Sequence, residues 1–214
     1  MNEQPFQIAH LDDLERLPRG EGLVWRPIRR RFGISAFGVN AYSAADAGDR
    51  VVEEHREVDG HEELYVVVAG RAAFTVGEEE HDAPAGTLVF VRPGTRRGAI
   101  AREPGTIVLG VGAKPGEVFE PSPWEEWAAA ESYRTLGRPD EARALMDASI
   151  AANPDAWQGY YNLACFESLD GRREHAFAAL ARAVELGPDE VRRYAAEDTD
   201  FDAIRSDPRF AELI

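Results

Sequence analysis

Four ionisable side chains lie close together in the sequence and could hold a divalent metal ion: His55, Glu57, His61 and Glu63. Two imidazoles and two carboxylates form a mixed nitrogen and oxygen ligand set that suits Zn²⁺, Fe²⁺, Mn²⁺ or Ni²⁺. The alternative is that these groups, with the glutamates around them, form a solvated tip that holds no metal. Which interpretation applies depends on whether the four side chains point to the same place.

A strand, a turn and a second strand are predicted to carry the four side chains. Residues 62–69 are rich in β-branched and aromatic residues, which favour strands. Asp59-Gly60 is a turn signal and predicts a hairpin between a strand at 55–58 and this one. A three-residue loop puts all four side chains on one face, whereas a two-residue loop shifts the register by one and splits them between two faces.

The stretch from His55 to Gly70 resembles the first motif of the cupins, a family of small double-stranded β-helix barrels. The motif has two histidines at i and i+2, then a glutamate, and then a glycine. Glu63 and Gly70 keep the family's spacing of seven residues between glutamate and glycine, but Glu57 stands where the family has its second histidine. The resemblance implies a cupin barrel, while the missing histidine departs from the family's metal site.

Residues 86–97 resemble the second cupin motif, a glycine, a strand, a Pro/Gly turn and a histidine, except that Arg97 stands in place of the histidine. A guanidinium stays charged and cannot coordinate a metal. If Arg97 projects into the barrel, it can pair with Glu63 or Glu57. Alternatively, it forms bidentate hydrogen bonds with the carboxylate or phosphate of a ligand.

Two aromatic residues of the predicted strands, Tyr65 and Phe90, are candidates to line a ligand pocket beside Arg97. The alternative is that both belong to the hydrophobic core, since large aromatic side chains on inward strand positions usually do. With Arg97, they predict that the barrel binds a small anionic molecule.

Short β segments separated by Gly, Asp and Pro recur through the first part of the chain. They lie at 22–27, 34–39, 50–58, 62–69, 72–76, 86–91 and 106–111. Many short strands with frequent turns predict a barrel or sandwich, which agrees with the cupin resemblance over residues 20–115. The three arginines at 29–31 are expected in a solvated strand or loop.

An internal repeat with a period of 34 residues follows a proline-rich linker at 115–123. The matching pairs are Ala130/Ala164, Gly137/Gly171, Ala142/Ala176, Met146/Leu180 and Pro154/Pro188. This period resembles that of tetratricopeptide repeats (TPR), which are pairs of antiparallel helices. We predict units at 123–156 and 157–190 with a cap at 191–214, because two such units leave an end face uncovered.

Composition excludes several classes of partner. The net charge of −15 argues against nucleic acids and anionic membranes, both of which require a basic surface. No apolar run approaches the roughly 20 residues of a membrane helix, and the N-terminal residues lack the features of a secretory signal. A single cysteine, Cys165, excludes an intramolecular disulfide, so we expect a cytoplasmic protein.

The sequence therefore predicts an α+β multi-domain protein, with an all-β cupin-like barrel at 1–120 and an all-α TPR-like domain at 121–214. This combination resembles bacterial cupin-domain proteins without an assigned activity. The favoured function is non-enzymatic binding of a small molecule or metal in the barrel, with the helical tail contacting a protein partner. The resemblance also implies a homodimer. The alternatives are a metal-dependent cupin enzyme (oxygenase, isomerase or lyase) that uses the His/Glu cluster, and a scaffold with an empty barrel.

Overall fold

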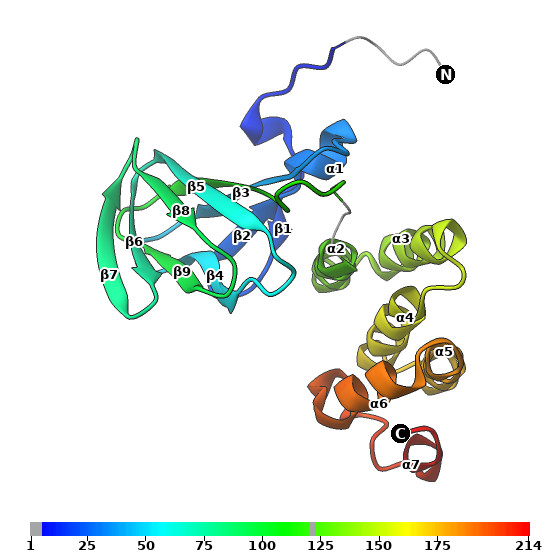
Figure 1. The fold of residues 1–214 in the computed structure, drawn as a ribbon. Coiled ribbons are helices and arrows are strands. Elements are labelled where there is room, and N and C mark those ends of the chain that lie inside the picture. The colour runs from blue at the N-terminus through cyan, green and yellow to red at the C-terminus, as the bar shows by residue number, and fades with distance from the viewer. Residues whose placement is uncertain (1–5, 120–122) are drawn as a thin grey trace. The chain divides into compact units, whose positions relative to one another are not determined.

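The protein consists of two compact units, residues 1–121 and residues 122–214, and each makes most of its residue contacts internally. A computed structural model describes residues 6–119 and 123–214. The first unit is built from strands and the second from helices (Figure 1). Each unit has a hydrophobic core of its own.

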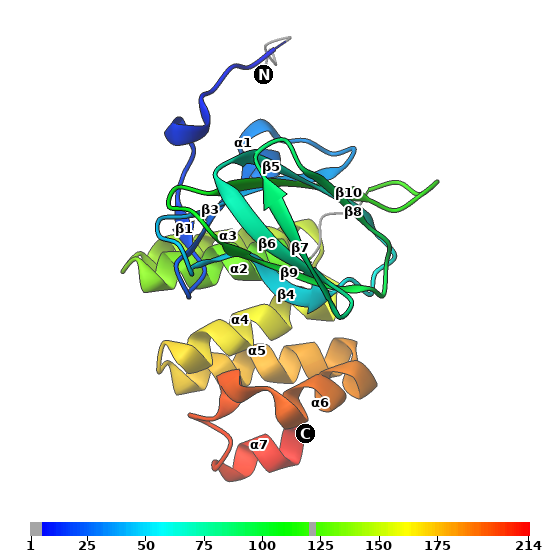
Figure 2. The same cartoon turned by 90° about the vertical axis from the view of Figure 1, so that its left-hand side faces the viewer.

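Two antiparallel β-sheets that face each other form the first unit (Figures 1 and 2). The six-stranded sheet has the order β1-β2-β3-β10-β5-β8, and the four-stranded sheet has the order β4-β9-β6-β7. The strands of the six-stranded sheet are β1 (Leu17–Pro18), β2 (Leu23–Arg26), β3 (Gly38–Ala44), β10 (Ile107–Ala113), β5 (Glu62–Ala69) and β8 (Leu88–Val91). Those of the four-stranded sheet are β4 (Arg50–Arg56), β9 (Arg96–Ala101), β6 (Arg71–Val76) and β7 (Glu79–Pro84). Two short helices, η1 (Leu11–Asp13) and α1 (Ile28–Phe32), precede β3.

Apolar side chains from both sheets fill the space between them. Val67 and Val108 come from the six-stranded sheet, and Phe74 and Ala99 from the four-stranded sheet, and all four are buried. Alternate residues of a strand point to opposite faces, so every second residue of these strands faces the interior. The same alternation directs Glu63 of β5 and Arg97 of β9, which lie near the ends of their strands, into the barrel.

β4 and β5 do not form the predicted hairpin, so this prediction was wrong. β4 pairs with β9 in the four-stranded sheet, and β5 pairs with β10 and β8 in the six-stranded sheet. Residues 57–61 cross from one sheet to the other. Gly60 has the positive φ of 93° that the turn signal implies, but a turn signal describes the local backbone and does not determine which sheet the next strand joins.

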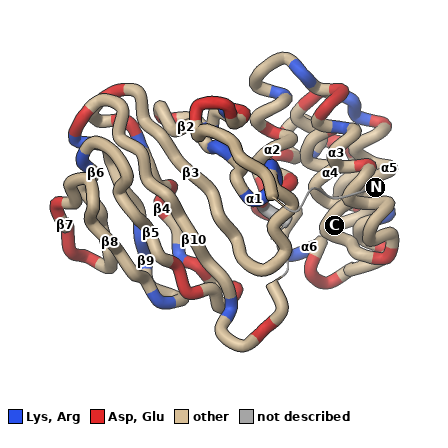
Figure 3. Tube along the Cα trace, turned by 90° about the horizontal axis from the view of Figure 1, so that it is seen from above, with Lys and Arg blue, Asp and Glu red and all other residues tan. Residues whose placement is uncertain are grey.

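Other strands also differ from the prediction. The strand expected at 34–39 begins only at Gly38 and continues to Ala44 as β3. The arginine run at 29–31 lies in the helix α1, which is followed by Gly33 with φ 66°. β7 and β9 were not predicted. β7 lies at the edge of its sheet and carries exposed acidic residues (Figure 3). Charged residues protect a sheet edge from pairing with other chains. Because they have a low strand propensity, the residue types of β7 do not predict a strand.

The second unit contains packed antiparallel helices. Its elements are α2 (Pro123–Thr135), α3 (Pro139–Ala152), α4 (Trp157–Leu169), α5 (Arg173–Leu186), α6 (Pro188–Glu197), η2 (Thr199–Phe201) and α7 (Pro208–Leu213). α2 packs against α3, and α4 packs against α5. The first helices of the two pairs begin at residues 123 and 157, and the second helices at 139 and 173, so each helix recurs after 34 residues.

The residues that repeat in the sequence occupy equivalent structural positions. Ala130 and Ala164 are both fully buried, so their small side chains allow neighbouring helices to approach closely. Gly137 and Gly171 have φ of 72° and 74°, the left-handed conformation that commonly follows the end of a helix. The 34-residue period therefore marks buried packing positions and inter-helix turns.

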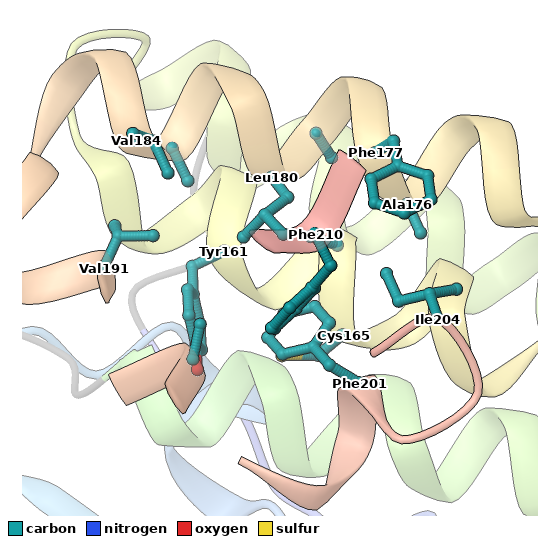
Figure 4. Packing of buried hydrophobic residues seen from close by; sticks show 14 residues of the cluster. Tyr161, Cys165, Ala176, Phe177, Leu180, Val184, Val191, Phe201, Ile204 and Phe210 are labelled. Atoms are coloured by element: carbon teal, nitrogen blue, oxygen red, sulfur yellow. The ribbon is translucent and has the colours of Figure 1, made fainter. Parts of the chain in front are cut away.

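The segment after α5 completes the helical core (Figure 4). Phe201 of η2, Ile204 of the turn that follows it and Phe210 of α7 are buried. They belong to the same core as Tyr161 of α4 and Leu180 of α5. This agrees with the need of a short helical array for a covering element at its end. None of the helices in the described ranges has the length and apolar character that crossing a membrane would need.

Candidate functional site

Arg97 is completely buried inside the barrel, at 0% exposure. Its partners in the sheet are His55 of β4 and Val76 of β6, and their register directs the Arg97 side chain between the two sheets. Its Nε lies 3.0 Å from Oε2 of Glu63, and its Nη1 donates a hydrogen bond to the carbonyl oxygen of Thr95 at 2.7 Å. Its Nη2 is also buried and has no hydrogen-bond partner among the residues that the structure describes.

His55 lies beside the same carboxylate. Its Nδ1 is 2.9 Å from the carbonyl oxygen of Glu53, so Nδ1 carries the hydrogen that is donated there. Its Nε2 lies 3.7 Å from Oε2 of Glu63. The Glu63 carboxylate raises the pKa of His55 above its ordinary value, although burial opposes this rise. A raised histidine pKa extends the pH range in which the imidazole is positively charged.

Glu63 is the centre of this cluster, because its Oε2 lies close to a polar group of each of the other three residues. The hydroxyl of Tyr65 donates to Oε2 at 2.8 Å, in addition to the contacts from Arg97 and His55. Burial raises the pKa of Glu63, but His55, Tyr65 and Arg97 outweigh burial and leave its pKa below the ordinary value. Burial and the Glu63 charge raise the pKa of Tyr65, so the phenol stays protonated.

The charges of this cluster do not cancel when His55 is protonated. Arg97 and protonated His55 contribute two positive charges, and Glu63 contributes one negative charge. Glu63 compensates the buried guanidinium of Arg97, and the additional positive charge lies on His55, whose side chain is 39% exposed. With His55 protonated, the cluster therefore carries a net positive charge.

Glu57 and His61 form a separate pair in the crossing segment. The Glu57 carboxylate accepts backbone N–H groups of Asp59, Gly60 and His61 at 2.8–2.9 Å, and His61 Nδ1 lies 3.3 Å from its Oε1. These contacts hold the loop that replaces the predicted hairpin. The structure thus divides the four predicted metal ligands into two pairs, His55 with Glu63 and Glu57 with His61.

The two aromatic residues predicted to line the pocket lie on opposite faces of the six-stranded sheet. Tyr65 is 3% exposed and points into the barrel. Phe90 is 51% exposed, next to the buried Val91 on β8, and the guanidinium of Arg92 lies 5.6 Å from its ring centre. Phe90 therefore lies on the outer face and does not line the interior, because the register of β8 places odd-numbered residues inward.

Interior residues of β3 and β10 were missed by the sequence predictions. Asn40, on β3, pairs with Gly110 of β10, and Gly110 pairs with Tyr65 of β5. Paired residues point to the same side of a sheet, so Asn40 belongs to the same interior face as Tyr65. The displaced prediction of β3 left Asn40 outside any strand, and an alternation counted from Tyr42 would have placed it.

The family model described as the cupin domain matches residues 44–110. These residues contain β4 to β9 and most of β10. Residues 44–110 are a cupin domain. The helical unit follows this domain, and no curated protein sequence matches the chain.

Solved structures that resemble the cupin domain each cover about half of this chain. KdgF from Halomonas sp. has 16% sequence identity and a TM-score of 0.42, over 50% of this chain and 92% of its own. A sugar phosphate isomerase of the cupin superfamily from Silicibacter pomeroyi has 20% identity and a TM-score of 0.43, over 51% and 77%. An RmlC-like cupin from Shewanella frigidimarina has 18% identity and a TM-score of 0.39, over 53% and 95%.

Many cupin domains hold a metal ion, but the four predicted ligands of this domain do not fit one. Within residues 6–119 and 123–214, the group of three or more His, Cys, Asp or Glu residues with ligand atoms within 4.8 Å of one another is Cys165, Asp198 and Asp200 of the helical unit, not the barrel residues. Arg97 additionally places a fixed positive charge beside Glu63. A cation at this point would be repelled by the guanidinium.

Proposed function

We propose that the cupin domain binds a small anionic molecule, a carboxylate or a phosphate, inside its barrel. The observation that carries the proposal is the buried Nη2 of Arg97, which has no hydrogen-bond partner in the described part of the chain. A buried donor without a partner costs roughly 1–3 kcal/mol, and more when it is charged. A ligand oxygen at this position removes that cost.

The neighbouring groups support an anion over a neutral ligand. His55 and Arg97 are adjacent partners of the four-stranded sheet, so both can contact one anionic group. Glu63 holds the guanidinium through Nε and leaves Nη2 free to bind. Arginine is well suited to this role because its planar guanidinium offers several donors in fixed directions.

The experiment is a titration of the ¹⁵N-labelled full-length protein with acetate and with inorganic phosphate, followed by NMR. We expect saturable shifts of resonances from the strands around Arg97. Arg97→Lys keeps the charge but removes the planar donor set, and it should weaken binding about tenfold or more. Arg96→Lys is the matched control, since Arg96 is adjacent on β9 but exposed and paired with Glu54, and it should bind like the wild type.

Absence of saturable binding of both anions to the wild type would refute the proposal and favour a scaffold with an empty barrel. Equal affinity of the wild type and the folded Arg97→Lys variant would also refute it, because binding would then lie elsewhere.

We also propose that the helical unit is a TPR-type module that contacts a protein partner. The support is the recurrence of its helices after 34 residues, with glycine turns and buried alanines at equivalent positions. Pull-down with the full-length protein and with an Ala164→Glu variant is the test, with circular dichroism to establish that the variant is folded. Equal capture by both folded proteins would contradict a role for this packing in partner binding.

A further inference from the structure

A second buried polar group without a partner faces the interior of the barrel. The side-chain oxygen of Asn40 is buried and has no hydrogen-bond partner within the described ranges. Buried polar side-chain atoms are hydrogen-bonded in the large majority of cases. The oxygen of Asn40 therefore lacks a hydrogen-bond partner among the described residues, as Nη2 of Arg97 does. The oxygen of Asn40 needs a donor, whereas Nη2 of Arg97 needs an acceptor.

We infer that the anionic ligand also carries a hydroxyl group and that Asn40 is the residue that recognises it, so the ligand class is small hydroxy acids. This inference rests on the proposed function, because it assumes that the anionic group is bound at Arg97. It adds a specificity-determining residue and a chemical class of ligand.

The registers of three neighbouring strands place Asn40 near the charged cluster. One interior row of the six-stranded sheet contains Gly38 of β3, Gly112 of β10 and Glu63 of β5. The next row contains Asn40, Gly110 and Tyr65. Asn40 thus lies two residues along β3 from the row of Glu63, on the same face.

Glycines occupy the middle of both rows, so β10 adds no side chain at these two positions between β3 and β5, and the rings of Tyr42 and Tyr65 and the side chain of Glu63 lie against these glycines. A Cβ added at Gly110 would lie 3.4 Å from Tyr42 and 3.5 Å from Tyr65, and one added at Gly112 would lie 3.3 Å from Cγ of Glu63. Any larger side chain at these positions of β10 would therefore press against Tyr42, Tyr65 or Glu63. With strands about 4.8 Å apart, the backbones of Asn40 and Tyr65 are roughly 10 Å apart.

The donors and acceptors of the two groups favour different parts of one ligand. A carboxylate only accepts hydrogen bonds, so it suits the guanidinium of Arg97 and the imidazolium of His55. A hydroxyl both donates and accepts, so it can satisfy the oxygen of the Asn40 amide, which a carboxylate cannot. A ligand with both groups satisfies both buried side chains, whereas a simple carboxylate leaves Asn40 without a partner.

The test compares two pairs of probes that differ in hydroxyl groups: lactate against propionate, and gluconate against hexanoate. Dissociation constants are measured by NMR titration of the full-length protein. We expect the wild type to bind the hydroxylated member of at least one pair about 3- to 10-fold more tightly, the effect of one net hydrogen bond. Asn40→Leu, which keeps the approximate size, should bring the two affinities of each pair to a ratio of about one.

Asn40→Ala is a second variant in case the leucine disturbs packing, and it should also lose the preference. Arg97→Lys should weaken both members of each pair by the same factor and so preserve the preference. If the wild type binds both members equally, or if the folded Asn40 variants keep the preference, the inference is overturned while the proposed anion binding stands. If no probe binds, the inference fails, and the phosphate titration decides whether the proposed anion binding fails with it.

Discussion

Arg97 of β9 and Glu63 of β5 form an ion pair that joins the two sheets inside the barrel, with Nε 3.0 Å from Oε2. Arg97 is 0% exposed and Glu63 is 21% exposed. Removing one partner of a buried pair leaves the other charge without compensation, which typically costs about 3–5 kcal/mol. Glu63 therefore compensates the buried charge of Arg97 and fixes the position of the guanidinium.

Glu63→Gln is expected to lower the free energy of unfolding by about 3 kcal/mol, because it leaves Arg97 as an uncompensated buried charge. Replacing both residues, in Arg97→Met with Glu63→Gln, should cost less than Glu63→Gln alone. Urea denaturation measures the free energy of unfolding of the single and the double variant. Glu54→Gln is the control, since its exposed ion pair with Arg96 should contribute little to the stability. Equal effects of Glu54→Gln and Glu63→Gln would contradict the assignment.

Anion binding is expected to weaken as the pH rises through the raised pKa of His55, whose cause is the adjacent Glu63 carboxylate. Below that pKa the imidazolium adds a positive charge to the site, and above it this charge is lost. The charged groups facing His55 are Glu63 from β5 and Arg97 from β9. Arg97 stays charged over this range, so the titration belongs to the histidine.

Affinity for acetate measured at several pH values checks this expectation, and His55→Gln should bind more weakly and show little pH dependence. His81, which is exposed, provides the control variant His81→Gln. An unchanged pH dependence in the folded His55→Gln variant would rule out His55 as the titrating group.

The fold was predictable because its signals are local or periodic, whereas the site required knowledge of which strands meet. The cupin spacing from Glu63 to Gly70 and the 34-residue helical period are properties of the sequence itself, and they gave the barrel and the helical region. His55 and Glu63 lie 3.7 Å apart as members of different sheets, although they were assigned to one hairpin. Their meeting results from the crossing at 57–61, and no local pattern specifies it.

Pairing between residues distant in sequence also explains why Phe90 and Asn40 were misjudged. Phe90 is an aromatic residue on a strand, but its face depends on the register of β8 with β5. Asn40 is a polar residue in a segment without a clear strand pattern, and its inward position depends on its pairing with Gly110. Arg97 was identified because it replaces a motif residue, so its position carried information that its residue type alone did not.

The outer face of β5 and β8 is expected to pair with a second copy of the chain. Leu64, Val68, Leu88 and Phe90 are 37–65% exposed on this face, and Leu64 pairs with Phe90 across the two strands. Contiguous exposed apolar residues commonly mark interaction surfaces. Light scattering after gel filtration should show a dimer, and Leu88→Lys with Phe90→Glu should yield a monomer. Val58→Lys, in an exposed loop, is the control, and a wild-type monomer at high concentration would disprove this prediction.

The contribution of Asp200 to the stability of the helical unit is expected to fall as the pH rises from about 4 to about 6. Burial, with the nearby charge of Asp198, raises the pKa of Asp200 from 3.8 to about 6. A carboxyl group with a raised pKa in the folded state keeps its proton where the unfolded chain has lost it. Folding is therefore favoured most below the unfolded pKa of 3.8, and the cost of ionisation is complete above about pH 6.

Asp200→Asn removes that ionisation and should stabilise the helical unit above pH 7. A shift of about two pKa units corresponds to about 3 kcal/mol, and since Asp200 is only half-buried, solvent screening reduces the expected gain to about 1 kcal/mol. Urea denaturation followed by helical circular dichroism at pH 7.5 and pH 4 measures it, and the gain should disappear at pH 4. Asp147→Asn changes an exposed aspartate of α3 and should show no such difference. A gain of equal size at both pH values would mean that Asp200→Asn acts through packing or hydrogen bonding, because ionisation alone makes the effect depend on pH in this direction.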